Sequence, residues 1–153
     1  MTANPDSAPP VSRISLPAVA PEAFGAMLNL NDEAQKGLSP CIAQLVKIRS
    51  SQLNGCSYCL EMHTREARQA GESEQRLGAL SGWRHTSLFT GRERAALALA
   101  EAITLVAEAR VPDDVYAEAA RHFDQTELAH LLWTIAVINT WNRVAVATGM
   151  TPA

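Results

Sequence analysis

The chain has 153 residues and a mass of 16.5 kDa; 47% of the residues are apolar, 19% are charged and 5% are aromatic. This composition fits one globular domain and excludes a disordered or collagen-like chain. The formal charge of −3 and the pI near 5.8 provide no basic surface, so we expect no nucleic-acid partner.

The first twenty residues contain four prolines and no periodic apolar pattern. We therefore predict an extended N-terminal arm over residues 1–20 and one helical domain over residues 21–153. Residues 1–10 lack the basic and apolar stretches of a signal peptide, and no apolar run approaches the roughly 18 residues of a membrane span. We expect a cytoplasmic protein with no membrane partner.

From residue 21 onward, proline, glycine and capping signals divide the chain into helices. Capping boxes are predicted at Thr90 with Glu93 and at Asp124 with Glu127. A loop is expected around Trp83. No stretch alternates as a strand does, so the predicted fold is all-α. The predicted helices cover about residues 21–37, 39–53, 56–70, 73–80, 90–109, 112–123 and 124–144.

The most informative stretch is residues 54–63, Asn-Gly-Cys-Ser-Tyr-Cys-Leu-Glu-Met-His. At about 100° per residue, Cys56, Cys59 and His63 fall on one narrow helix face. A helix start favours the thiolate, and the helix dipole alone would make Cys56 the more acidic thiol. Glu66 continues this face and could orient the imidazole, although a solvent-exposed Glu66 is the favoured interpretation. The pattern indicates thiol redox chemistry.

Two other interpretations of the cysteines stay open. Cys56, Cys59 and His63 could be three zinc ligands, with Cys41 folding back as a fourth. Alternatively, both cysteines could be small buried apolar side chains. Covalent haem attachment is excluded because Leu60, and not histidine, follows the second cysteine.

Several other residues carry weaker expectations. Cys41 is expected to be a buried thiol that only packs. Lys47 and Arg49 are expected on a solvated helix face, although their proximity to the redox turn could favour the thiolate. Trp133 and Trp141 are expected in the core or in a subunit interface. The remaining histidines, 85, 122 and 130, are scattered and favour no catalytic role.

Residues 45–70, centred on Gln-Leu-Asn-Gly-Cys-Ser-Tyr-Cys-Leu-Glu-Met-His, resemble the alkylhydroperoxidase AhpD core of the carboxymuconolactone decarboxylase-like superfamily. The resemblance extends to Trp83-Arg84 and to residues 91–97 and 138–143, and covers most of residues 22–148. It implies an AhpD-like helical bundle that assembles as a homo-oligomer, commonly a trimer or hexamer. It also implies peroxidase activity through a reversible disulfide, with no flavin, haem or metal cofactor.

The resemblance assigns Cys59 as the peroxidatic cysteine, Cys56 as the resolving cysteine and His63 to the proton relay. The family usually has a glutamate twelve residues before the first cysteine, where this chain has Gln44. Because a neutral amide cannot accept the thiol proton, we predict weak peroxidase activity or a preference for disulfide exchange. Glu66 could substitute for the missing base.

The expected function is therefore thiol-dependent reduction of hydrogen peroxide or organic hydroperoxides, with an external dithiol, lipoyl or thioredoxin-like, as reductant. Two alternatives remain. One is a redox sensor or disulfide-exchange protein. The other is a carboxymuconolactone decarboxylase-type enzyme on the same fold, which needs no cysteine pair.

Overall fold

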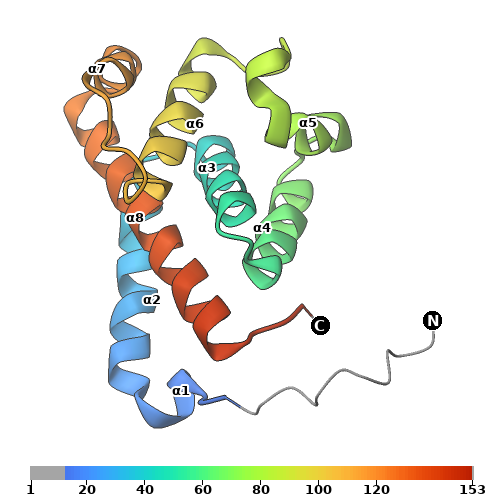
Figure 1. Ribbon diagram of the computed structural model, residues 1–153, viewed down its shortest axis with the longest axis vertical. Helices are drawn as coiled ribbons and strands as arrows, with labels where there is room; N and C mark the ends of the chain where they lie inside the picture. The colour runs from blue at the N-terminus through green and yellow to red at the C-terminus, as the bar shows by residue number, and fades with distance from the viewer. Residues whose placement is uncertain (1–12, 153) are drawn as a thin grey trace.

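The structure is a computed structural model that describes residues 13–152, and every regular element in this part of the chain is a helix (Figure 1). The prediction of an all-α fold is thus confirmed for these residues. The elements are α1 (Leu16–Val19), α2 (Pro21–Gln35), α3 (Pro40–Leu53), α4 (Ser57–Gln69), α5 (Glu74–Ala79), the 3₁₀ helix η1 (Leu80–His85), α6 (Gly91–Thr104), α7 (Asp113–His122) and α8 (Gln125–Thr148).

Helix α3 lies at the centre of the bundle and packs against α4, α6 and α8 (Figure 1). It begins as predicted, because the Ser39 hydroxyl accepts the Ile42 backbone N–H at 3.3 Å and Pro40 occupies the first turn. Ile42 packs in a core shared with α6, α7 and α8, whereas Leu45 packs in a second core with α4 and η1. A helix with apolar residues on opposite sides must be buried on both, which places α3 in the middle.

Both predicted capping boxes are present and start α6 and α8. Helix α6 ends at Thr104, five residues before the predicted end, because residues 106–109 are exposed and no packing stabilises a further turn. The predicted loop around Trp83 is the 3₁₀ helix η1. Trp83 is buried there, and its indole N–H donates to Glu101 at 2.9 Å.

Most of the predicted N-terminal arm, residues 1–12, lies outside the described residues. Its remaining part contains the single turn α1, and the Arg13 guanidinium donates to the Ala147 carbonyl at 2.8 Å, near the end of α8. The division into an arm and a domain stays a prediction. None of the described helices is long and apolar enough to cross a membrane.

Candidate active site

The cysteine pair lies at a tight junction between α3 and α4. Gly55 has a φ of +63°, which turns the chain and which a side chain would strain. Cys56 then adopts extended backbone angles as the N-cap of α4, and its sulfur accepts the Cys59 backbone N–H at 3.3 Å. The two sulfurs are therefore held at a helix N-terminus, as the spacing predicts.

Both cysteines are free thiols with about 2% of their surface exposed, and they pack against Ile138 and Ala145 of α8. Burial raises the pKa of the Cys59 thiol to about 12, and the hydrogen bond with Cys56 adds to the increase. The Asn142 amide and the helix-start backbone N–H act in the opposite direction without compensating. Burial thus outweighs the helix start, and Cys59 needs a proton acceptor to become a thiolate near neutral pH.

His63 lies one turn after Cys59 and is buried. Its Nδ1 is 3.0 Å from Glu66 Oε2, and the same oxygen accepts a hydrogen bond from Gln44 Nε2 at 3.1 Å. An Nδ1–H that donates to Glu66 leaves Nε2 as the ring nitrogen able to take a proton. Glu66, which we expected to be a simple exposed side chain, has 43% of its side chain exposed yet holds both neighbours.

Burial lowers the pKa of His63, and the nearby Lys47 cation lowers it further, against the effect of Glu66. The imidazole is therefore neutral near pH 7. A neutral imidazole is the form that can accept the proton of a thiol.

Cys59 and His63 open into a pocket of about 390 Å³ between α2, α3, α4 and α8. Gln44 and Lys47 of α3 and Glu66 of α4 contribute polar side chains to it. Cys56 does not line this pocket, so a ligand inside meets Cys59. The apolar part of the wall consists of Phe24, Leu28, Tyr58, Met62, Trp141, Ala145 and Met150.

The prediction that Lys47 and Arg49 lie on a solvated face is wrong. Lys47 is only 5% exposed, and its ammonium donates to the Gln35 side-chain oxygen. Arg49 is largely buried and paired with Glu101 at 2.7 Å. Burial lowers the pKa of Lys47. Sequence spacing places Lys47 one turn after Gln44 on the same helix face, but only the tertiary contact with Gln35 of α2 shows that it is buried.

Asn142 is a second residue that sequence reasoning missed. It is fully buried, donates to Ser51 Oγ at 3.0 Å and accepts from Asn54 Nδ2 at 2.9 Å. Asn139 accepts from the same Asn54 amide at 2.9 Å. The signal in the sequence is two amides one turn apart on an otherwise apolar helix. This network ties the end of α3 to α8 directly behind the cysteine pair.

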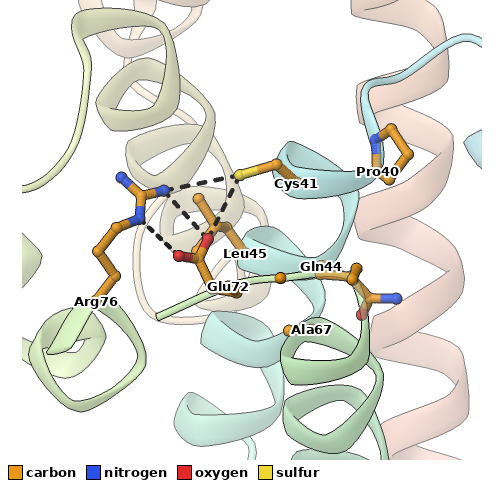
Figure 2. Close-up of a pocket in the computed structure, with 9 residues that line it drawn as sticks. Pro40, Cys41, Gln44, Leu45, Ala67, Glu72 and Arg76 are labelled. Atoms are coloured by element: carbon orange, nitrogen blue, oxygen red, sulfur yellow. Dashed lines mark hydrogen bonds and ion pairs between the residues drawn. The ribbon is translucent and has the colours of Figure 1, made fainter. Parts of the chain in front are cut away.

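Cys41 is not a buried packing residue, as we had predicted, but is exposed in a different pocket of about 310 Å³. Figure 2 shows Cys41 grouped there with Glu72 and Arg76, while the Gln44 amide extends away from them. The Cys41 sulfur lies 3.5 Å from a Glu72 oxygen and 3.4 Å from a Glu93 oxygen, which share its single S–H donor. Although the residue is exposed, its sulfur is partly desolvated against the pocket wall, and this desolvation together with the Glu93 carboxylate raises the pKa of the Cys41 thiol to about 12.

Cys41 therefore does not join the other two cysteines as a metal ligand. Among residues 13–152, no three His, Cys, Asp or Glu side chains are grouped to hold a metal ion. Trp141 lines the Cys59 pocket, whereas Trp133 is 56% exposed on α8, outside the core. His85, His122 and His130 do not line the Cys59 pocket.

The sequence pattern of the carboxymuconolactone decarboxylase family matches residues 21–102. The chain is 39% identical over 138 residues to the uncharacterised protein YdfG of Bacillus subtilis, covering 90% of this chain and 94% of YdfG. A crystal structure from Agrobacterium tumefaciens, of a protein of unknown function with a suggested role in AhpD-type antioxidant defence, is 38% identical. It superposes with a TM-score of 0.89 over 93% of this chain and 98% of that one. The debrominase Bmp8 shares the fold alone, at 23% identity and a TM-score of 0.75 over 86% of this chain and 70% of its own.

Proposed function

The chain belongs to the carboxymuconolactone decarboxylase family, and we propose that it is an AhpD-like, thiol-dependent peroxidase acting on hydrogen peroxide or small organic hydroperoxides. One observation carries the proposal. Cys59 lines a pocket together with a neutral His63, and the Cys56 sulfur accepts the Cys59 backbone N–H at the helix start.

The reaction begins when His63 Nε2 takes the proton of the Cys59 thiol. The thiolate attacks the terminal oxygen of R–O–O–H, so that an S–O bond forms as the O–O bond breaks. Cys59 is oxidised to a sulfenic acid, and the leaving RO⁻ is protonated by the imidazolium to give ROH. The Cys56 thiol then displaces hydroxide from the sulfenic sulfur, with release of water and formation of the Cys56–Cys59 disulfide.

An external dithiol returns the protein to its starting state. It reduces the disulfide by two thiol–disulfide exchanges and becomes oxidised itself. A lipoyl or thioredoxin-like protein in a reducing cytoplasm is the proposed reductant. We also propose that the chain forms a homo-oligomer, a trimer or hexamer, and the exposed Trp133 supports a subunit contact on α8.

The direct test is thiol trapping and mass spectrometry after one equivalent of peroxide, with Cys41→Ser as the matched control because Cys41 lies in the other pocket. We expect a Cys56–Cys59 disulfide in the wild type and in the control. Peroxide consumption with lipoyl, thioredoxin-like and small dithiols should disappear in Cys59→Ser and Cys56→Ser. Absence of the disulfide in the wild type would refute the mechanism.

Disulfide exchange is the second candidate function, because the neutral Gln44 amide stands beside Glu66 where a base was expected, while the Cys56–Cys59 pair can still exchange with a dithiol. A protein of this kind would exchange with a dithiol partner in the same assay while consuming little peroxide. The debrominase Bmp8 shows that the fold also supports other chemistry, so the fold alone does not select the reaction. A decarboxylase-type activity would survive Cys59→Ser, which separates it from both redox functions.

A further inference from the structure

The wall that α3 contributes to the Cys59 pocket carries two polar groups with unfilled hydrogen-bonding capacity, Gln44 and Lys47. They are three residues apart, so they lie one above the other on the same helix face. Neither takes the proton of the Cys59 thiol, although Lys47 helps to keep His63 neutral and Gln44 donates to Glu66.

Gln44 has a buried side-chain oxygen with no hydrogen-bond partner, the one such side-chain atom in the part of the chain that the structure describes. Exchanging the positions of its amide oxygen and nitrogen is unfavourable. Nε2 donates to Glu66 Oε2 at 3.1 Å, and the exchange would place the amide oxygen against that carboxylate oxygen. Glu66 thus fixes Oε1 as an acceptor that lacks a donor. A buried acceptor left without a donor destabilises the protein, and a ligand that supplies a donor removes this cost.

Lys47 lacks hydrogen-bond acceptors, whereas Gln44 Oε1 lacks a donor. Its ammonium has three N–H donors, and in the described residues only the Gln35 oxygen accepts from it. Asp32 and Glu66 also face the pocket, but Asp32 is exposed to solvent, Glu66 is held by His63 and Gln44, and neither pairs with Lys47. A buried ammonium without a carboxylate partner is costly, so the site gains when a ligand supplies acceptors.

We propose that Gln44 and Lys47 form the binding site for the peroxide group itself, with Gln44 Oε1 accepting the terminal O–H and Lys47 Nζ donating to the oxygen that bears the organic substituent. This inference rests on the proposed peroxidase function. A hydroperoxide has one O–H donor and two acceptor oxygens, which matches one acceptor and one cationic donor on adjacent turns. The pair directs the terminal oxygen to the Cys59 sulfur.

The same contacts act on the reaction. As the S–O bond forms and the O–O bond breaks, negative charge develops on the leaving oxygen, where Lys47 donates. An ammonium there stabilises the alkoxide until the proton that left Cys59 reaches it from His63. Gln44, which cannot serve as a base, keeps a use as a substrate-binding residue.

Two reactions of Cys59 separate peroxide binding from thiol activation. Oxidation by cumene hydroperoxide needs the thiolate and the peroxide contacts, whereas alkylation by iodoacetamide needs only the thiolate. Both rate constants would be measured on the wild type, Lys47→Met and Gln44→Met by rapid quenching and peptide mass spectrometry. Lys36→Met and Gln69→Met are the controls, because both side chains are exposed and lie outside the pocket.

We expect Lys47→Met to lower the oxidation rate about 10- to 100-fold and Gln44→Met about 5- to 10-fold, the ranges for charged and neutral hydrogen bonds. The alkylation rates should stay within about twofold of the wild type, and the controls should change neither reaction. Thermal unfolding checks the fold, and Lys47→Met should unfold no earlier than the wild type because it removes a buried charge.

If oxidation and alkylation fall together in both variants, or if oxidation is unchanged, the peroxide-binding role is wrong. A wild type that reacts with peroxide no faster than a free thiol would instead refute the proposed function itself. The two failures are therefore distinguishable within one experiment.

Discussion

Replacing Gln44 by glutamate restores the carboxyl group that the AhpD resemblance leads one to expect at this position. In this chain the new carboxylate would meet Glu66, whose Oε2 lies 3.1 Å from Gln44 Nε2. Two carboxylates at this separation do not both ionise easily, and together they retain one proton. The substitution therefore creates a carboxyl pair beside His63, with a pKa raised from the usual carboxyl range towards neutrality.

The separation sets the size of the effect. Two charges 3.1 Å apart repel by about 5 kcal/mol at an effective dielectric constant of about 20. The Glu66 side chain is 43% exposed, so water screens the pair, and about half of that energy, 2–3 kcal/mol, is the appropriate value. A group that titrates near neutral pH is an efficient acceptor for the proton on His63.

We expect Gln44→Glu to raise the second-order rate constant for peroxide about tenfold at pH 7.5, below the usual contribution of a positioned general base. Stopped-flow measurement between pH 5 and 9 should also show a new ascending limb near neutrality that the wild type lacks. Gln69→Glu, which adds the same charge on an exposed side chain, is the control. An unchanged rate and pH profile in Gln44→Glu would refute the coupling of residue 44 to His63.

Three further substitutions test the site and its support. His63→Gln should lower the rate constant for peroxide about 100-fold. It should also make the free energy of unfolding in urea less sensitive to acid. The lowered pKa of His63 stabilises the fold above the unfolded value of about 6.5, and this contribution is lost as the pH falls. Cys59→Ser should reduce the decrease in the free energy of unfolding at alkaline pH. The Cys59 pKa raised to about 12 stabilises the fold below the unfolded value of about 8.5, and this stabilisation is lost as the pH rises above that value. Gly55→Ala should destabilise the protein by about 1–2 kcal/mol, since the φ of +63° is strained for alanine, whereas Gly25→Ala, inside α2 with open space around it, should be neutral or stabilising.

The helix starts that the sequence predicts correctly are those marked by a capping residue. The capping residue Ser39 and the boxes at Thr90 and Asp124 mark their helix starts, because a cap satisfies backbone groups within a few residues. Ends depend on packing across the fold. Nothing local indicates that α6 stops at Thr104, or that Trp83 lies in a 3₁₀ helix with its indole N–H bonded to Glu101.

The same division applies to the site. Helical spacing places Cys59 and His63 on one face without reference to the rest of the chain, and the pocket contains both. The pKa of Cys59 could not be anticipated, because the burial that raises it comes from α8, some eighty residues later in the chain. Lys47 was misassigned for a similar reason: a lysine is solvated by default, and only the tertiary fold covers it with α2.

The pocket around Cys59 differs from the remainder of the described structure because it contains buried polar groups without partners. Elsewhere the largely buried charges are paired, as in Arg49 with Glu101 and Arg76 with Glu93. In the Cys41 pocket of Figure 2, Arg76 likewise pairs with Glu72. The Cys59 pocket instead keeps a buried ammonium without a carboxylate partner and an amide oxygen without a donor. Since a fold selected for stability alone would remove such groups, their concentration beside a reactive thiol argues for ligand binding there, independently of any relative.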